Sequence, residues 1–135
     1  MRIVLAHGVF DLMHVGHLNH LMDARGFGDY LVVSVVPEKF ATKRQPIYSD
    51  AARIRLLENL RCVDRAVLCD GPGPELVIER IRPDVYVRGD DYRGIKMPES
   101  DLLERLGIPV MYTDAPSDST GRIIGQIRAQ YTESL

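Results

Sequence analysis

The chain has 135 residues, a formal net charge of −2 and a hydrophobic fraction of 45%. This length and balance are typical of one globular domain with a single core. The net negative charge gives no electrostatic basis for binding a polyanion, so we predict no nucleic-acid partner. The apolar runs are too short to span a bilayer and no leader-like segment precedes the first one, which predicts a cytoplasmic protein with no membrane partner.

Cys62 and Cys69 are the only cysteines. Their spacing matches no common metal site, and both lie in or beside apolar segments. We therefore predict that they are reduced residues of the core.

Five short runs rich in apolar and β-branched residues predict β-strands. They are Ile3–Ala6, Tyr30–Val36, Arg65–Leu68, Asp84–Val87 and Pro109–Tyr112. Several of these runs are continuous rather than alternating, which is the pattern of strands that are buried on both faces of a parallel sheet.

Amphipathic stretches between and after these runs predict helices. They are Val15–Ala24, Ala51–Leu60, Pro74–Ile81, Glu99–Leu106 and Ser119–Gln130. Ser49 or Asp50 would cap the second of them. In the last helix, the spacing of Ile123, Ile124 and Ile127 predicts one face that packs inward.

The alternation of strands and helices predicts an α/β fold, a doubly wound, Rossmann-like parallel sheet of three layers, in one domain over residues 1–135. In this architecture, ligands bind outside the carboxyl ends of the strands. The one long polar connection, residues 37–48, is of the kind that often moves and contributes to function.

All four histidines lie in the segment HGVFDLMHVGHLNH, residues 7–20, where the first strand is expected to lead into the first helix. Gly8 allows the backbone to approach a ligand closely, and Gly16 leaves space beside the backbone. His14 and His17 are three residues apart and can project to the same side. The free N–H groups of a helix start suit phosphate, and two imidazoles would add donors for phosphoryl oxygens. The segment therefore predicts a site for phosphate.

Part of this segment, GVFDLMHVGH, resembles the G-x-F-D-x-x-H-x-G-H signature of the nucleotidyltransferase superfamily, as found in the cytidylyltransferases. The segments DYLVVSVV, ARIRLLENLRCVDRAVL, IRPDVYVRGDDY and DSTGRII are also similar to segments of that family. The resemblance implies an enzyme that joins a nucleoside triphosphate to a phosphate monoester and releases pyrophosphate. It further implies Mg²⁺ as cofactor, no covalent intermediate and a homodimer, with catalysis by positioning and charge stabilisation.

The resemblance implies a role for each residue of the signature. His14 and His17 would hold the nucleotide phosphates and stabilise charge on the α-phosphoryl group and the leaving pyrophosphate. Asp11 would orient a histidine or a Mg²⁺-bound water, with an Asx turn as the alternative. The implied nucleotide-binding residues at this junction are Gly8, Val9, Phe10, Asp11 and Gly16.

The resemblance also implies contacts from loops and helices further along the chain. Lys43, beside Arg44, would reach the phosphates when the 37–48 connection closes. Arg53 and Arg61 match arginines of the family that contact the nucleotide, and exposed helix charges are the alternative. The remaining implied nucleotide-binding residues are Gly89, Asp90, Asp91, Ser119, Thr120 and Arg122. For Gly89, Asp90 and Asp91 the alternative is an ordinary acidic turn, and for Ser119 and Thr120 it is a simple helix cap.

Two substrate pairs fit the resemblance. Gly89–Tyr92 and Arg61 resemble the glycerol-phosphate cytidylyltransferases, whereas the spacing from Pro46 to Arg53 resembles the heptose-phosphate adenylyltransferases. Residues 114–121 depart from the cytidylyltransferase run R-T-E-G-I-S-T-T, because the first arginine is missing and Gly121 replaces the second threonine. We favour CTP with glycerol 3-phosphate, and the alternative is ATP with a sugar phosphate such as heptose 1-phosphate.

Other classes of protein explain the histidine segment less well. His7, His14, His17 and His20 could form a metal-binding module, but no cysteine ligands accompany them. A nucleotide sensor without catalysis would not need both histidines of the signature. We therefore predict that His14 and His17 act on phosphate, that His7 and His20 have no role in the site, and that His20 lies at the surface.

Overall fold

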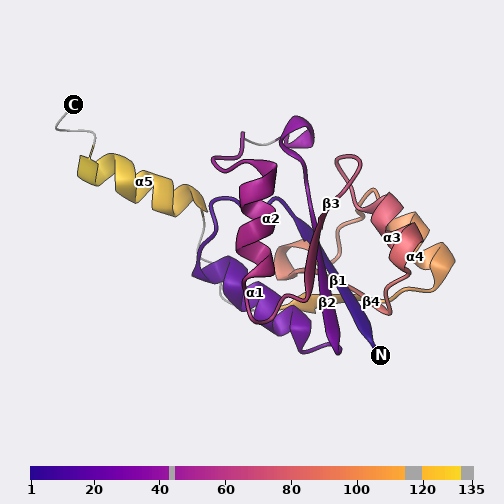
Figure 1. Ribbon diagram of the computed structural model, residues 1–135. Coiled ribbons are helices and arrows are strands. Elements are labelled where there is room, and N and C mark those ends of the chain that lie inside the picture. Colours follow the sequence, from indigo (N-terminus) through magenta and orange to yellow (C-terminus); the bar gives the residue numbers. More distant parts are fainter. Residues whose placement is uncertain (43–44, 115–119, 132–135) are drawn as a thin grey trace.

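The predicted strands form one parallel sheet in the computed structural model, which describes residues 1–42, 45–114 and 120–131. The strands are β1 (Ile3–Gly8), β2 (Tyr30–Val35), β3 (Arg65–Leu68), β4 (Val85–Gly89) and β5 (Val110–Thr113). Their order in the sheet is β3-β2-β1-β4-β5, which is the doubly wound arrangement (Figure 1). The predicted Rossmann-like α/β fold is confirmed.

Helices cover both faces of the sheet. They are α1 (Val15–Arg25), α2 (Asp50–Glu58), α3 (Glu75–Ile81), α4 (Ser100–Leu106) and α5 (Thr120–Tyr131), with the short 3₁₀ turns η1 (Glu38–Phe40) and η2 (Asp90–Tyr92). Figure 1 shows α1 and α2 on one face and α3 and α4 on the other, which gives the three predicted layers. Within the described residues, no helix is both long and apolar enough to cross a membrane.

The apolar run of β1 is continuous because the strand is buried on both faces of the sheet. Val4 and Ala6 pack in the core cluster under α1 and α2, and Leu5 packs in the cluster under α3 and α4. All three side chains are fully buried. The two cysteines also pack as predicted, since Cys69 is buried, Cys62 is half-buried, and neither forms a disulfide.

Two strands extend two residues further at their carboxyl ends than the sequence predicts, and the added residues lie at the site. β1 continues through Gly8 and β4 through Gly89, so His7 and Arg88 are strand residues at the carboxyl edge of the sheet. The start of α2 follows the prediction, because Ser49 is the N-cap and its Oγ accepts a hydrogen bond from Ala52 N at 3.1 Å.

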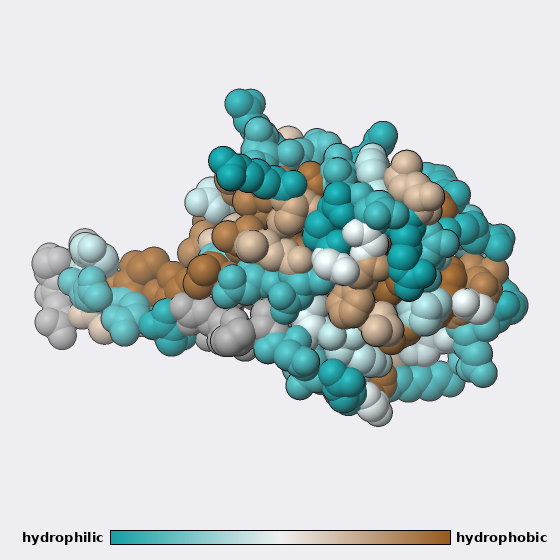
Figure 2. All heavy atoms as spheres, turned by 90° about the horizontal axis from the view of Figure 1, so that it is seen from below, coloured by the Kyte–Doolittle hydropathy of each residue, from teal (hydrophilic) through white to brown (hydrophobic). Residues whose placement is uncertain are grey.

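The last helix departs from the predicted packing. Helix α5 projects from the body (Figure 1), and apolar side chains are visible along the projection in Figure 2. Ile123 and Ile124 are half-buried, but Ile127 is 47% exposed, so the prediction that it packs inward is wrong. The amphipathic spacing predicts an apolar face and does not specify which surface covers it.

A buried arginine joins the loops at the carboxyl edge of the sheet. Arg53 on α2 is fully buried. Its Nη1 donates to the carbonyls of Val9 and Val36 at 3.0 and 2.7 Å, and its Nε donates to the carbonyl of Tyr48 at 3.3 Å. Its Nη2 pairs with Asp50. All three guanidinium nitrogens thus bind protein acceptors inside the fold, and the predicted contact of Arg53 with the nucleotide stays a prediction.

We predict that Arg53→Met will lower the free energy of unfolding by about 3 kcal/mol, because buried carbonyls lose their donor. Arg55→Met on the same helix is the matched control, since Arg55 is exposed, and we expect it to cost less than about 0.5 kcal/mol. Urea unfolding followed by circular dichroism measures both variants. Equal losses would show that the buried guanidinium does not hold these loops together.

Candidate active site at the carboxyl edge of the sheet

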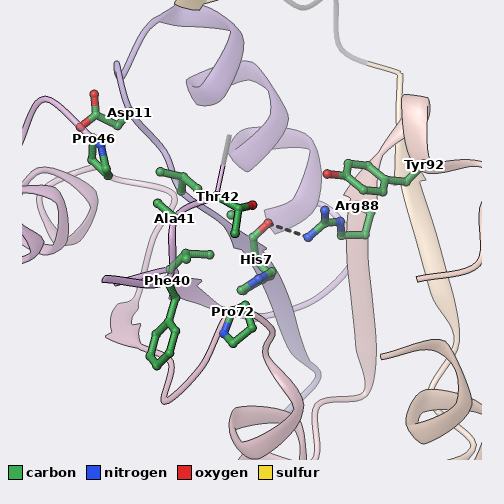
Figure 3. Close-up of a pocket in the computed structure, with 12 residues that line it drawn as sticks. His7, Asp11, Phe40, Ala41, Thr42, Pro46, Pro72, Arg88 and Tyr92 are labelled. Carbon is green, nitrogen blue, oxygen red and sulfur yellow. Dashed lines mark hydrogen bonds between the residues drawn. The ribbon is translucent and has the colours of Figure 1, made fainter. Parts of the chain in front are cut away.

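The strand order reverses between β1 and β4, and a doubly wound sheet binds its ligand at that position. His7 near the end of β1 and Arg88 near the end of β4 lie side by side there. Arg88 Nη1 donates to the carbonyl of His7 at 3.2 Å (Figure 3). These two residues therefore mark the boundary of the crevice that the fold predicts.

A cavity of about 430 Å³ opens at this boundary, and we call it the edge cavity. The end of β1, Val36, residues 40–42, Pro46 and Pro72 form most of its wall, and Arg88 and Tyr92 close one side (Figure 3). Its volume lies within the range of small-molecule sites. Gly8, Val9 and Asp11 of the signature line it, so the cavity is continuous with the segment predicted to hold phosphate.

Arg88 is a residue of this site that the sequence analysis missed. It is only 9% exposed, and its guanidinium stacks on the ring of Tyr92 at 3.8 Å. Tyr86 also accepts a hydrogen bond from Nη1, at 3.5 Å. Within the described chain, neither Nε nor Nη2 of Arg88 donates to a protein acceptor. A charged residue at the end of an otherwise apolar strand, as in VYVRG, is the sequence signal that could have identified it.

Buried neighbours hold the charge of Arg88 in place. Burial works against that charge, but Tyr86, Tyr92 and Glu99 together raise the pKa of Arg88 above its ordinary value. The Tyr86 hydroxyl donates to Glu99 Oε2 at 2.5 Å, and burial raises the pKa of Tyr86 well above its ordinary value. The arginine is therefore a fixed cation at the boundary of the crevice.

His14 and His17 cap the start of α1 reciprocally. The Nδ1 atom of His14 accepts a hydrogen bond from Gly16 N at 3.0 Å, and the Nδ1 atom of His17 accepts one from His14 N at 3.2 Å. The ring centroids lie 4.0 Å apart. Because a backbone N–H donates to each Nδ1 atom, each ring in its neutral form carries its proton on Nε2. The cap thus fixes two Nε2–H donors next to each other.

The electrostatic surroundings keep His17 neutral at pH 7. Burial, followed by the proximity of His14 and His20, lowers the pKa of His17 from 6.5 to about 4. A neutral imidazole can donate one hydrogen bond to a phosphoryl oxygen without carrying a net charge. Together with the N-terminal end of α1, the pair forms a fixed set of donors for an anion.

The other two histidines are half-buried, and each hydrogen-bonds with a neighbouring element. His20 hydrogen-bonds through Nδ1 with Thr113 Oγ1 at 2.7 Å, which ties α1 to the end of β5. His7 hydrogen-bonds through Nδ1 with Ser34 Oγ at 3.2 Å and lines the edge cavity. Burial, and next the charge of Arg88, lowers the pKa of both residues, for His7 to about 4. The surface position predicted for His20 is therefore wrong, and His7, for which the sequence predicts no role, lines the cavity.

The other signature residues also support the loop that carries the histidines. A Cβ atom on Gly8 would lie 3.1 Å from the ring of Phe10, so the packing of that ring is one reason for glycine here. Phe10 itself is 5% exposed, with φ +55°, and packs in the core. Asp11 Oδ2 accepts a hydrogen bond from Tyr48 N at 2.8 Å, which joins the signature to the segment just before α2.

Several predicted nucleotide-binding residues gather on the side of β4, β5 and α5. Gly89 ends β4, and Asp90 and Asp91 are exposed on η2. Arg93 pairs with Asp90 at 2.7 Å and with Asp114 at 3.5 Å, joining η2 to the end of β5.

The start of α5 also lies beside the signature. Thr120 is buried, and its Oγ1 donates to the carbonyl of Leu12 at 3.2 Å. Arg122 is exposed on the same helix. Lys43 and Ser119, two further predicted contacts, lie outside the described residues.

Arg61 lies away from this site. It is exposed in the turn between α2 and β3, and β3 begins at Arg65, which pairs with Val32 near the start of β2. Arg61 is therefore at the amino edge of the parallel sheet, opposite the crevice. The structure does not bring Arg61 together with the other predicted nucleotide-binding residues, because α2 carries the chain back from the carboxyl edge before Arg61 is reached, and its contact with a nucleotide stays a prediction.

No group of three or more histidine, cysteine, aspartate or glutamate side chains is placed to hold a metal ion in the part of the chain that the structure describes. The four histidines therefore do not share one metal site in the described residues. His7 and His20 join separate elements, and His14 and His17 cap α1.

The fold and the histidine cap define a doubly wound protein with a site for a phosphate-containing ligand at its carboxyl edge. Residues 5–114 match the model of the cytidylyltransferase-like family. The chain belongs to this family.

Two curated relatives are proteins named bifunctional protein HldE. That of Streptomyces coelicolor is 40% identical over 78% of this chain and 24% of its own length. That of Citrifermentans bemidjiense is 35% identical over 96% of this chain and 28% of its own length. The chain thus spans about a quarter of the length of the curated relatives that it matches.

Solved structures share the fold. The lipopolysaccharide core biosynthesis protein from Thermoplasma volcanium superposes with a TM-score of 0.75 at 28% identity, over 87% of this chain and 99% of that chain. A pantothenate synthetase from Thermus thermophilus superposes with a TM-score of 0.56 at 18% identity, over 90% of this chain and 58% of that one, and shows the fold alone.

We predict that the free energy of unfolding falls as the pH is lowered from 7 to 5. The folded protein keeps His7 and His17 neutral, with pKa values of about 4, whereas the unfolded chain takes up protons near 6.5. The unfolded state then binds more protons, so stability rises with pH in this window. Urea unfolding at both pH values measures it.

A His17→Gln variant is the control, because it removes one of the two groups and should show a smaller difference between the two pH values. NMR of the histidine Cε1 protons provides the direct readout. Titration of His7 or His17 with a midpoint near 6.5 in the folded protein would contradict the assignment of both as neutral histidines at pH 7.

Proposed function

We propose that this chain is a nucleotidyltransferase domain that joins ATP to a sugar phosphate such as heptose 1-phosphate and releases pyrophosphate. The observation that carries the proposal is the fixed pair of donors on His14 and His17, in the same signature whose residues Gly8, Val9 and Asp11 line the edge cavity. Membership of the cytidylyltransferase-like family supports the reaction class.

This substrate pair, ATP and a sugar phosphate, replaces CTP and glycerol 3-phosphate, the pair that we favour from the sequence. Arg61 is one of the two features that favoured CTP, and it lies at the opposite edge of the sheet. The relatives named HldE and the protein of lipopolysaccharide core biosynthesis favour the sugar-phosphate pair. CTP with glycerol 3-phosphate remains the second candidate, because Gly89–Tyr92 still matches the corresponding motif.

The two substrates would approach the signature from opposite sides. Asp90, Asp91 and Thr120 lie on the side of β4, β5 and α5, and we assign the nucleotide to that side. The edge cavity lies towards β1, β2 and Pro72, and we assign the acceptor to it. Arg88 lies between the two sides and would reduce the repulsion between the acceptor phosphate and the triphosphate.

The reaction follows from this arrangement. An oxygen of the acceptor phosphate forms a bond to the α-phosphorus, and the bond from the α-phosphorus to the bridging oxygen of pyrophosphate breaks. The Nε2–H groups of His14 and His17 donate to oxygens whose negative charge increases in that step. The N-terminal N–H groups of α1 add to the donor set.

Mg²⁺ fits the site as a companion of the triphosphate. This ion is usually held by one or two carboxylates together with substrate phosphates rather than by a complete protein cage. Asp90 and Asp91 are exposed carboxylates on the proposed nucleotide side. When bound, Mg²⁺ would neutralise part of the phosphate charge. Contacts from Lys43, Ser119 and Arg122, a homodimer and a cytoplasmic location remain predictions.

A pyrophosphate-release assay tests the substrate pair. With Mg²⁺, we expect turnover with ATP and a sugar 1-phosphate to exceed turnover with CTP and glycerol 3-phosphate by at least about tenfold. The sugar 1-phosphates to test are those of heptose, mannose and glucose. Preference for CTP with glycerol 3-phosphate would contradict the substrate assignment, and no pyrophosphate with any of these pairs would contradict the reaction class.

His14→Ala and His17→Ala should each lower the rate by about 10²–10³-fold, because each removes a donor to the transition state. Met22→Ala is the matched control on the same helix, since Met22 is 56% exposed and lies outside the proposed site. Circular dichroism of each variant checks that α1 still forms. Near-normal turnover in either histidine variant would refute the role of the cap in catalysis.

A further inference from the structure

A second, smaller cavity of about 250 Å³ adjoins the edge cavity, and we call it the side cavity. The two cavities share His7, Pro72, Arg88 and Tyr92 as a common wall. Beyond that wall, the side cavity is lined by Glu75 at the start of α3 and by Glu99 just before α4, among others. Neither Glu75 nor Glu99 belongs to a motif that the sequence predicts to bind a ligand.

We propose that the side cavity binds the hydroxyl-bearing part of the acceptor, a neutral polyol, while Arg88 binds the acceptor phosphate. This inference rests on the proposed function, because it assigns the acceptor of that reaction to a particular part of the site. It also names Glu75 as a residue that determines which acceptor is used.

Arg88 supplies the anchor for the phosphate. The side chain is more than nine-tenths buried, yet its Nε and Nη2 atoms donate to no acceptor among the described residues. Three N–H groups are thus left for a ligand. A buried cation with unused donors on the wall between two cavities is suited to an anionic group that lies across that wall.

Two carboxylates make the side cavity different from the edge cavity. The carboxylate of Glu75 lies over Gly73, where an added Cβ atom would be 2.6 Å from Oε1. Glu99 is 4% exposed and already accepts a hydrogen bond from Tyr86 through Oε2. No hydrogen bond or ion pair of the Glu75 carboxylate is present within the described part of the chain. Glu75 is therefore the group available to a ligand.

These groups select a neutral polyol. Hydroxyl groups donate to carboxylates in charge-assisted hydrogen bonds, so a sugar or another polyol gains affinity there. A second anionic group on the acceptor would be repelled by Glu75 and Glu99. A quaternary ammonium group would lack an aromatic face, because the guanidinium of Arg88 covers the ring of Tyr92 at 3.8 Å.

Binding measurements on the full chain test the proposal without requiring turnover. Isothermal titration calorimetry with mannose 1-phosphate, inorganic phosphate and 3-phosphoglycerate compares the two parts of the acceptor. We expect Glu75→Gln to weaken mannose 1-phosphate about tenfold and to leave inorganic phosphate unchanged or slightly tighter. Arg88→Met should weaken both ligands, and 3-phosphoglycerate should bind more weakly than mannose 1-phosphate.

Glu79→Gln on the same helix is the matched control, because Glu79 is exposed and pairs with Arg105 outside both cavities. Gly73→Ala is a second variant, which displaces the Glu75 carboxylate without removing its charge and should also weaken mannose 1-phosphate. Urea unfolding checks that each variant folds.

Unchanged binding of mannose 1-phosphate to Glu75→Gln, or a preference for phosphocholine or 3-phosphoglycerate over the sugar phosphate, would overturn the assignment of the side cavity. Failure of the proposed function has a different signature. In that case the binding pattern holds for the three probes, but no pyrophosphate is released with any nucleoside triphosphate.

Discussion

The hydrogen bond from Arg88 to the carbonyl of His7 joins the two strands between which the sheet reverses, and the rest of the site depends on it. A doubly wound sheet opens at this position because the helices that follow β1 and β4 leave towards opposite faces. The bond places a cation where ligands of both sides would meet. Tyr86 and Glu99 support that cation from within the fold, and Tyr92 covers one face of it.

The histidine pair has a structural and a chemical role that cannot be separated. The Nδ1 atoms satisfy backbone N–H groups at the start of α1, and this commitment leaves the protons on Nε2. Burial lowers the pKa of His17 to about 4, which keeps it a neutral donor over the physiological range. The proposed triphosphate site would thus rely on oriented histidine donors and on one fixed arginine.

The sequence predicts the fold well, because continuous apolar runs such as residues 3–6 have few solutions other than strands buried on both faces. It also identifies His14 and His17, because spacing and a helix start determine their geometry locally. The sequence does not distinguish the buried Arg53 from Arg88, which lines a cavity, because each is a charged residue between apolar neighbours. Burial depends on loops that come from distant parts of the chain. Arg61 is different, because following the chain direction through α2 would have placed it at the amino edge.

A crystal structure of the protein with Mg²⁺ and a non-hydrolysable ATP analogue tests the central claim most directly. The account predicts triphosphate oxygens within hydrogen-bond distance of Nε2 of His14 and of His17, with the nucleoside on the side of η2 and α5. The edge and side cavities would remain open for the acceptor next to Arg88. A triphosphate bound elsewhere, or bound with both histidine rings turned away from it, would contradict the account.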